Sequence, residues 1–360
     1  MLRGSGVALA GGVLSRVMQA GAAEPASPEI HLNLNENAWG ASPRVLPALQ
    51  REFPHISRYA DAALAQPFLE QIAAYEGVPV EQIVPGEILG ALGLWLGSNG
   101  GPGGEFVYSV PGYTALIDAA AHVGGIGVPV PLNARLENDL PALSAKIGAK
   151  TRAVYLINPH NPSGTVSPIT EFRSFLQSAS AHAPVIVDEA YLEYTADFQD
   201  RSAVSLVREG ANVLVFRTFD KIHGLAGLPI GYTIAPRELA AKLRKQGLGD
   251  FESLGRLNIA AASAALGDTA HVTSIQKAVA AERAQWRRVL NELGLPNTDA
   301  QASFIFFNAG ERRRAIVEAF AKNRIEVGRS FSPLNTWVRI TIGLPGENAA
   351  AQQVLRSTVR

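Results

Sequence analysis

Short, continuous apolar runs alternate with helical patterns in the middle of the chain. A run without intervening polar residues is typical of a strand covered on both faces, as in a parallel sheet. Between two runs, Ser167 and Pro168 predict the N-cap and first turn of a helix whose buried face includes Ile169. Alternating strands and helices predict an α/β fold with ligand-binding loops at the carboxyl ends of the strands. The runs are residues 105–109, 153–157, 185–187 and 213–216.

After about residue 249 the pattern changes, and separated strands accompany one long helical stretch. Strand-like segments cover residues 303–307, 325–327 and 337–342. This mixture predicts a smaller α+β domain. We therefore expect a large domain over residues 46–249 and a small domain over 250–360, with residues 29–45 as the N-terminal segment of the small domain.

Residues 1–28 combine a basic start, a short apolar stretch and small residues at which a peptidase could cleave. These are the parts of an export signal, although Arg16 interrupts them. An N-terminal arm is the alternative, so the location stays open between the cytoplasm and the periplasm. The apolar stretch covers nine residues. A bilayer span needs about 20, so we expect no membrane span.

The composition excludes several kinds of partner and cofactor. The chain has 32 basic and 32 acidic residues, and this balance gives no electrostatic footprint for nucleic acid. The absence of cysteine excludes thiolate metal sites, and the 7 histidines are not spaced as metal ligands. Glycines within residues 97–104 precede a predicted strand, whereas those of a dinucleotide-binding loop follow one. We therefore expect neither a metal nor a nicotinamide cofactor.

Polar residues directly follow three of the predicted strands. Asn161, Asp188 and Lys221 lie in the segments after the second, third and fourth runs. Taken singly, Asn161 could be a turn residue, Asp188 a helix cap or structural ion pair, and Lys221 a solvated side chain. A carboxylate at the end of an apolar strand is costly unless it meets a cation. An amide, an acid and a lysine at successive strand ends therefore favour one shared site.

These segments resemble fold type I enzymes that depend on pyridoxal 5'-phosphate (PLP), and within them the class I and II aminotransferases of the histidinol-phosphate aminotransferase branch. The resemblance extends from Leu32 over nearly the whole remaining chain. It implies a mostly parallel sheet of the seven-stranded type in the large domain, and a homodimer with active sites at the subunit interface. The matching segments are Asn33–Gly40, Arg58–Tyr59, Pro111–Tyr113, Asn158–Gly164, Asp188–Tyr191, Lys221 with Gly224–Leu228, and Trp337–Thr341.

The resemblance implies roles for the residues around the cofactor ring. Lys221 would bond covalently to PLP and then move a proton at the substrate Cα. Asp188 would keep the pyridine nitrogen protonated, so that the ring withdraws electrons. Asn161 and Tyr191 would donate to the ring hydroxyl oxygen, and Tyr113 would stack on the ring. Of these residues, Lys221, Asp188 and Tyr191 are the expected catalytic set.

The resemblance also implies contacts to the phosphate and to the substrate. Thr218 matches a phosphate ligand, and Tyr59 matches a residue that reaches the cofactor phosphate of the neighbouring subunit. Arg339 matches an arginine that binds the substrate carboxylate with two hydrogen bonds. Arg329 matches a second substrate-contacting arginine, and Trp39 stands where the branch usually has a substrate-side tyrosine.

The residues expected around the cofactor phosphate depart from the family pattern. Asp220 stands in place of a hydroxyl, Pro229 in place of an arginine, and Glu87 lies at the start of the helix that usually contacts the phosphate. A carboxylate beside a phosphate is repulsive by on the order of a few kcal/mol in a partly buried site. We therefore expect weaker cofactor binding than in typical relatives, unless Arg217, His223 or a basic group of the partner subunit replaces the missing cation.

The expected activity is transfer of an amino group between an amino acid or amino-alcohol phosphate and a 2-oxo acid. Two alternatives stay open. The same fold and cofactor could support decarboxylation or racemisation, or the chain could be a binding protein that has lost cofactor affinity. A bound cofactor that borohydride fixes on Lys221 would argue against the last of these.

Overall fold

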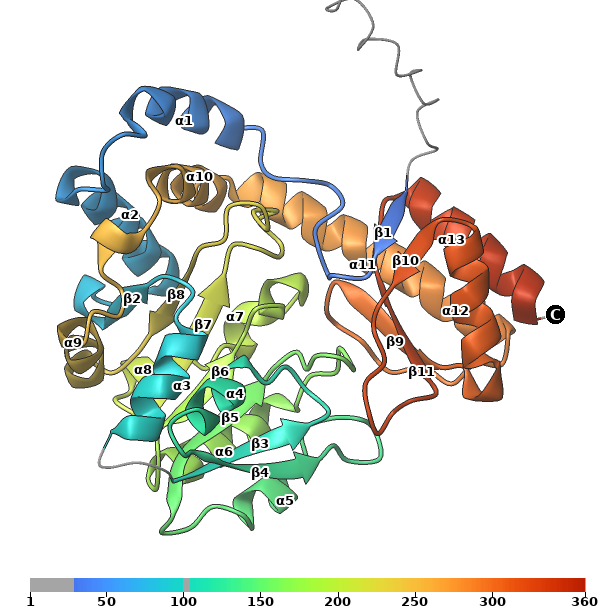
Figure 1. Cartoon of the computed structure of the whole chain (residues 1–360), viewed down its shortest axis with the longest axis horizontal. Helices are drawn as coiled ribbons and strands as arrows, with labels where there is room; N and C mark the ends of the chain where they lie inside the picture. The colour runs from blue at the N-terminus through green and yellow to red at the C-terminus, as the bar shows by residue number, and fades with distance from the viewer. Residues whose placement is uncertain (1–28, 100–103, 360) are drawn as a thin grey trace, which may run out of the picture.

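The computed structural model describes residues 29–99 and 104–359, so the predictions for residues 1–28 lie outside the described residues. A seven-stranded sheet forms the larger part of the molecule (Figure 1). Its neighbouring strands run parallel except β8, which is antiparallel to both of its neighbours. The predicted α/β fold with a mostly parallel sheet is confirmed. In spatial order the strands are β2 (Ile83–Pro85), β8 (Gly231–Ile234), β7 (Val213–Thr218), β6 (Val185–Asp188), β5 (Thr151–Ile157), β3 (Glu105–Val110) and β4 (Ile126–Pro131).

Alternate residues of the central strands enter two separate hydrophobic cores. In β6, Val185 and Val187 pack in one core and Ile186 packs in the other. Helices cover both faces of the sheet, which is why the central strands contain continuous apolar runs. The first face is covered by α1 (Val45–Glu52), α2 (Ala62–Glu76), α5 (Leu140–Ser144), α6 (Ile169–Ser180), α8 (Val204–Arg208) and α10 (Arg256–Leu266), and the second by α3 (Leu89–Ser98), α4 (Ala115–Ala121) and α9 (Arg237–Lys245).

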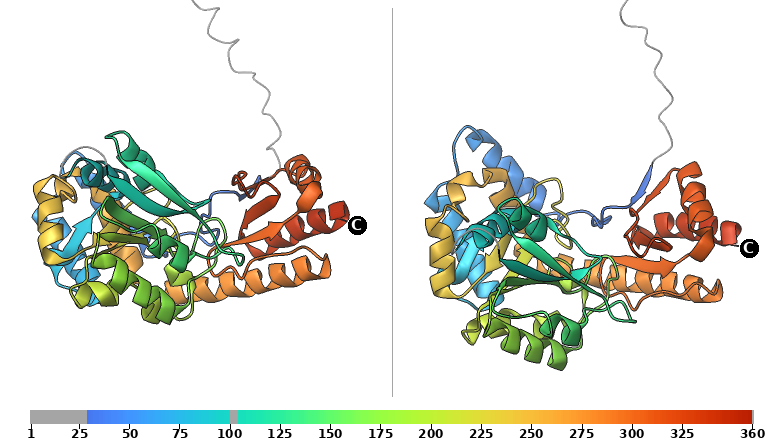
Figure 2. Two further views of the ribbon diagram at one scale, coloured as in Figure 1. Left: turned by 90° about the horizontal axis from the view of Figure 1, so that it is seen from below. Right: turned by 60° about the horizontal axis from the view of Figure 1, so that its bottom comes forward.

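A third core lies in the smaller part of the molecule, which β1 forms together with the elements from α11 to α13 (Figure 2). Two short sheets flank it, with β1 parallel to β10 and β9 antiparallel to β11. α10 packs against α1 and α2 of the larger part, although it lies within residues 250–360, which are expected to form the small domain. The elements of this part are β1 (Ile30–Leu32), α11 (Thr269–Glu292), β9 (Phe304–Asn308), α12 (Arg313–Lys322), β10 (Ile325–Val327), β11 (Trp337–Thr341) and α13 (Pro345–Val359).

The predicted cap of the helix after β5 is wrong in detail. α6 begins at Ile169 with Pro168 at the N-cap position, and no side chain caps it. The backbone N–H of Ser167 donates instead to Oδ1 of Asn158 at 2.9 Å, which fixes the chain as it leaves β5. Ile169 is 37% exposed, whereas Phe172, Phe175 and Leu176 of the same helix are buried.

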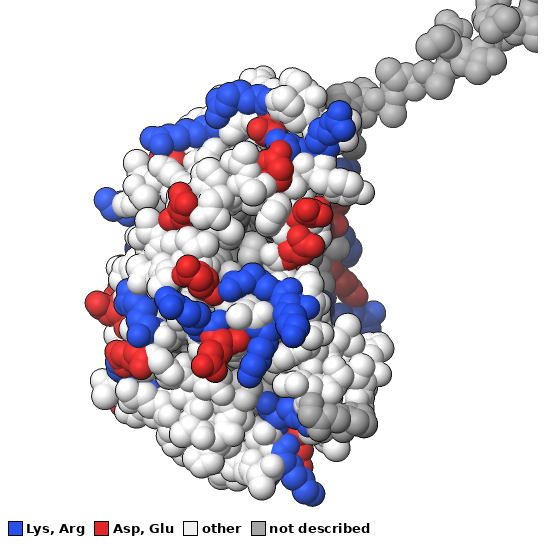
Figure 3. All heavy atoms as spheres, turned by 90° about the vertical axis from the view of Figure 1, so that its left-hand side faces the viewer, with Lys and Arg blue, Asp and Glu red and all other residues white. Residues whose placement is uncertain are grey.

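The remaining surface carries both signs of charge. On the face with α2 and α9, acidic and basic side chains are interspersed (Figure 3), in keeping with their equal numbers in the chain. Among residues 29–99 and 104–359, no helix combines the length and the apolar character that crossing a membrane requires.

A buried ionic cluster joins β7 to α2. Arg217 is 2% exposed, and its Nε lies 3.3 Å from Oε1 of Glu76. Its Nη2 lies 3.1 Å from Oε2 of Glu189 and donates to the Ser202 hydroxyl at 3.0 Å. The hydroxyl of Tyr232 donates to Oε1 of Glu76 at 2.6 Å. Two buried carboxylates thus depend on one guanidinium for their charge balance.

We expect Arg217→Met to lower the free energy of unfolding by about 3–5 kcal/mol, because it leaves these two carboxylates buried without a cation. Urea denaturation of the two proteins measures this difference. The matched control is Arg173→Met, which removes a surface ion pair with Glu209 and should cost at most about 1 kcal/mol. Equal losses in the two variants would contradict the importance of the buried cluster.

Candidate active site

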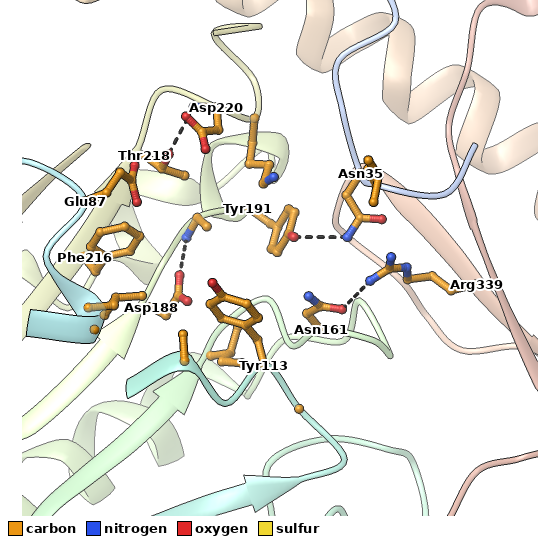
Figure 4. Close-up of a pocket in the computed structure, with 18 of the residues that line it drawn as sticks. Asn35, Glu87, Tyr113, Asn161, Asp188, Tyr191, Phe216, Thr218, Asp220 and Arg339 are labelled. Carbon is orange, nitrogen blue, oxygen red and sulfur yellow. Dashed lines mark hydrogen bonds between the residues drawn. The ribbon is translucent and has the colours of Figure 1, made fainter. Parts of the chain in front are cut away.

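A cavity of about 400 Å³ lies at the carboxyl ends of β5, β6 and β7, next to the sheet of β9 and β11 (Figure 4). Residues from both parts of the molecule line it. Among the residues predicted to bind cofactor or substrate, those that line it are Tyr113, Asn161, Asp188, Tyr191, Thr218, Lys221, Arg329 and Arg339, and the two unexpected carboxylates, Glu87 and Asp220, line it as well. The amide, the acid and the lysine predicted to meet at the strand ends therefore do lie around one cavity.

A tight loop after β7 holds Lys221. The backbone N–H of Gly224 donates to the Lys221 carbonyl at 2.9 Å, and Asn37 Nδ2 donates to the Ile222 carbonyl at 2.8 Å. Gly224 has φ +71°, and a Cβ there would lie 2.6 Å from the carbonyl carbon of Gly40. Only glycine fits this close approach. The loop is thereby fixed against the Asn37–Gly40 segment, with Lys221 on the cavity wall.

Asp188 ends β6 and is buried at the base of the cavity. The Tyr155 hydroxyl donates to its Oδ2 at 3.0 Å, and the Ala190 N–H donates to its Oδ1 at 3.0 Å. Burial raises the pKa of Asp188 to about 6, although these two hydrogen bonds and Lys221 oppose the shift. A buried carboxylate at this position can pair with a protonated ring nitrogen, and that cation would in turn favour the ionised form of Asp188.

On the opposite wall, two separate hydrogen bonds join the larger and the smaller part of the molecule. Asn35 Nδ2 donates to the Tyr191 hydroxyl at 3.0 Å. Arg339 Nη1 donates to Oδ1 of Asn161 at 2.7 Å (Figure 4). Tyr113 is 48% exposed, and its ring lies at the cavity between Asp188 and Asn161. The smaller part of the molecule thus fixes the positions of Tyr191 and Asn161, the two residues predicted to donate to the ring hydroxyl oxygen.

Two guanidinium groups mark the end of the cavity near β11. The Cζ atoms of Arg329 and Arg339 lie 4.9 and 5.0 Å from the ring centroid of Phe331. Arg339 Nη2 donates to the Asn33 carbonyl at 2.7 Å, while its Nε is buried without a hydrogen-bond partner among the described residues. Burial lowers the pKa of Arg339 to about 10, and the charge of Arg329 acts in the same direction. Arg339 remains a cation at neutral pH and keeps a free donor.

Two of the predicted site residues lie outside the cavity. Trp39 is partly buried against the core of the smaller part, and its backbone N–H donates to Oδ1 of Asn37 at 3.0 Å. The structure therefore gives no support for its predicted contact with substrate. Tyr59 is 83% exposed in the segment before α2, where a neighbouring subunit could reach it.

Neither Arg217 nor His223 supplies the missing phosphate-binding cation. Arg217 and Thr218 are successive residues of β7 and point to opposite faces, so Arg217 enters the buried ionic cluster. His223 is also buried, and its Nε2 lies 3.3 Å from Oε1 of Glu193. Pro229 does not line the cavity. The side chains that do surround Thr218 are Glu87 and Asp220 (Figure 4).

Sequence reasoning missed two residues that shape the site. Asn35 adopts φ +60° and supports Tyr191, and the only signal for it was its place in the asparagine-rich segment 33–37. Phe331 contacts both arginines but lies in no recognisable motif. No cluster of metal-ligating side chains occurs in the part of the chain that the structure describes.

Residues 27–354 match the family model described as aminotransferase class I and II. The chain belongs to this family. It is 31% identical over 319 residues to histidinol-phosphate aminotransferase 2 of Carboxydothermus hydrogenoformans, covering 88% of this chain and 87% of that one. It is 34% identical over 326 residues to the aromatic amino acid aminotransferase of Mycobacteroides abscessus, covering 89% and 90%.

Among solved structures, this aminotransferase is similar to histidinol-phosphate aminotransferase from Sinorhizobium meliloti in complex with pyridoxal-5'-phosphate. The TM-score is 0.83 with 28% sequence identity, and the match covers 92% of this chain and 91% of that one. These findings confirm the resemblance and the fold type I architecture, and they make this chain a PLP-dependent aminotransferase.

The residues of this aminotransferase fit the PLP ring but not its phosphate. One cavity contains the four groups that the ring requires: a lysine, a buried carboxylate, a tyrosine and an amide. The phosphate requires donors and positive charge. Thr218 and the start of α3 offer donors at that end, but the charged side chains around Thr218 are the two carboxylates of Glu87 and Asp220.

Proposed function

We propose that this aminotransferase exchanges the amino group of an amino acid with the oxo group of a 2-oxo acid, and that Arg339 binds the substrate carboxylate. The observation that carries the proposal is the buried Nε of Arg339, which has no hydrogen-bond partner among the described residues. Arg339 lines the same cavity as Lys221. A buried charged donor of this kind gains strongly from a carboxylate ligand.

A second candidate substrate is an amino-alcohol phosphate, such as the histidinol phosphate in the names of several relatives. The second guanidinium, Arg329, favours this candidate because two adjacent cations suit a phosphate dianion. A panel that compares phenylalanine, histidine and histidinol phosphate as amino donors, each with 2-oxoglutarate, distinguishes the two. Turnover of histidinol phosphate alone would favour the second candidate.

In this proposal each residue around the cavity has a separate role in the reaction. When bound, PLP supplies a ring that withdraws electrons from the substrate Cα. Lys221 moves the proton at that carbon, and Asp188 holds a proton on the ring nitrogen. Tyr191 and Asn161 donate to the ring hydroxyl oxygen, and Asn35 and Arg339 fix their positions.

We expect Arg339→Lys to raise KM for the amino donor by roughly ten- to a hundredfold, because a lysine cannot offer two parallel donors to a carboxylate. Steady-state kinetics over a range of donor concentrations measures this change. The control is Arg313→Lys, whose Nε donates to the Trp337 carbonyl at 3.1 Å on the same strand but outside the cavity. An unchanged KM in the Arg339 variant would show that another group binds the carboxylate.

We propose that the active molecule is a homodimer in which Tyr59 of one subunit reaches the cavity of the other. Large apolar side chains on the segment from α1 to Tyr59 support this, since four of them are exposed to an unusual degree. They are Leu46 at 61%, Phe53 at 50%, Ile56 at 64% and Tyr59 at 83%. Exposed apolar side chains grouped on one segment are typical of an interface between subunits.

We expect Ile56→Arg to convert the dimer into a monomer and to reduce turnover, because the substitution places a charge in the buried centre of the proposed interface. Light scattering on a sizing column measures the mass. The control is Ile126→Arg, which changes a side chain of similar exposure (59%) on the edge strand β4. A wild-type protein that elutes as a monomer would contradict the proposed assembly.

A further inference from the structure

The chemistry of PLP determines which end of the cavity its phosphate would approach. On the pyridine ring the aldehyde carbon lies between the hydroxyl group on one side and the phosphate-bearing methylene on the other, with the nitrogen opposite. In the proposed function, Lys221 bonds to the aldehyde carbon, Asp188 faces the nitrogen, and Tyr191 and Asn161 face the hydroxyl. The phosphate arm then points away from Asn161 and towards Thr218, on the other side of the cavity (Figure 4).

That end of the cavity is lined by acidic side chains. Glu87 and Asp220 lie on either side of Thr218 in Figure 4, and both line the cavity. Burial raises the pKa of Glu87 to about 7, a shift that the charges of Asp220 and Asp188 increase and the Thr218 hydroxyl opposes. Burial also raises the pKa of Asp220, and its Oδ1 has no hydrogen-bond partner among the described residues.

Glu87 also occupies a place that favours an anion. It precedes Ile88, the N-cap residue of α3, and so lies at the positive end of that helix. Its carboxylate is packed against β8, since a Cβ at Gly231 would lie 2.6 Å from Oε1 of Glu87. The protein's own carboxylate therefore lies close to the helix terminus that would otherwise stabilise a bound phosphate.

The described residues offer little positive charge to offset these carboxylates. Lys221 is the only lysine that lines the cavity, and its amine is committed to the aldehyde in the proposed function. The two arginines of the cavity, Arg329 and Arg339, lie at the end near Phe331. Arg217 and His223 are paired with buried glutamates on the other side of β7.

We propose that the Glu87–Asp220 end of the cavity selects against a phosphate dianion, so that this chain binds pyridoxal, which has a neutral hydroxymethyl group at that position, more tightly than PLP. The inference rests on the proposed function, because Lys221 and Asp188 set the orientation of the ring. It assigns to the two carboxylates a role in choosing between the phosphorylated and unphosphorylated forms of the cofactor.

The test compares two aldehydes that differ only in the phosphate. The full-length protein, freed of cofactor with hydroxylamine, is titrated separately with pyridoxal and with PLP in a phosphate-free buffer, and absorbance gives each Kd. Borohydride reduction and mass spectrometry verify that each aldehyde is attached to Lys221. The pyridoxal concentration is corrected for the fraction held as its internal hemiacetal, which PLP cannot form. The ratio Kd(pyridoxal)/Kd(PLP) then isolates the phosphate end, since both ligands make the same contacts to the ring.

We expect a ratio below 1 for the wild type. In the double variant Glu87→Gln with Asp220→Ser, measured at pH 8, the ratio should rise by at least about tenfold, because the repulsion between the phosphate and the ionised forms of these two carboxyl groups is removed. The control, Glu238→Gln on the exposed surface of α9, should leave the ratio unchanged.

A wild-type ratio above 1, or a ratio that the double variant leaves unchanged, overturns the inference while the attachment to Lys221 still supports the proposed function. Failure of both aldehydes to attach to Lys221 contradicts the proposed function as well. The wild-type measurement requires no variant, so the inference can fail even if the double variant does not fold.

Discussion

Lys221→Ala is expected to abolish covalent binding of the cofactor and all measurable turnover. Lys221 is the only lysine among the described residues that line the cavity, so no neighbouring amine can take its place. General acid–base catalysis by one positioned side chain is worth roughly 10²–10⁴-fold, and the loss of covalent attachment adds to this. Absorbance near the boundary of the visible and ultraviolet ranges, together with mass spectrometry after borohydride reduction, measures the attachment.

The matched control for this prediction is Lys242→Ala, which removes an exposed lysine of α9 and should change neither property. An adduct found on any lysine other than Lys221 in the wild-type protein would refute the assignment.

Asp188→Ala is expected to lose far more activity than cofactor affinity. The carboxylate acts on the charge that develops during the reaction, and removing one such electrostatic contact typically lowers kcat by about 10²–10³-fold. The comparison is between kcat and the cofactor Kd of the same variant. Asp200→Ala, on the exposed part of α7 (Phe198–Arg201), is the control. Full activity in the Asp188 variant with cofactor bound would show that another group keeps the ring nitrogen protonated.

Much of the larger sheet could be predicted from the sequence because its central strands are buried on both faces. Residues 153–157 of β5, 185–187 of β6 and 213–216 of β7 are apolar at successive positions, which is the pattern of a strand with no solvent-exposed face. Since parallel strands end at one edge, the positions of Asp188 and Lys221 at a shared cavity also followed from the sequence.

Other features depend on contacts between distant segments and could not be read from the sequence. Arg217 directly precedes a cavity residue, but alternation along β7 turns it towards Glu76, 141 positions earlier in the chain. Asn35 and Tyr191 are hydrogen-bonded across 156 positions. Phe331 reaches the cavity only because the two parts of the molecule meet there. No local pattern encodes such pairings.

The predicted N-cap residue of α6 is wrong for a more local reason. Ser167 is a good N-cap residue by propensity, yet its backbone N–H is bonded to the Asn158 side chain at the end of β5. This tertiary contact sets the path of the segment, and the helix begins after Pro168. Propensity predicted the presence of the helix and its buried face, while a contact outside the helix determined its first residue.

The central claim is that this chain transfers an amino group between two carbon skeletons, and isotope transfer tests it most directly. The protein, supplied with pyridoxal or PLP, is incubated with an aromatic amino acid labelled with ¹⁵N and with unlabelled 2-oxoglutarate, and the products are measured by mass spectrometry. The account predicts ¹⁵N-labelled glutamate and one aromatic 2-oxo acid for each glutamate formed, with both absent in Lys221→Ala. Release of carbon dioxide and an aromatic amine, or recovery of the donor as a racemate without labelled glutamate, would contradict it.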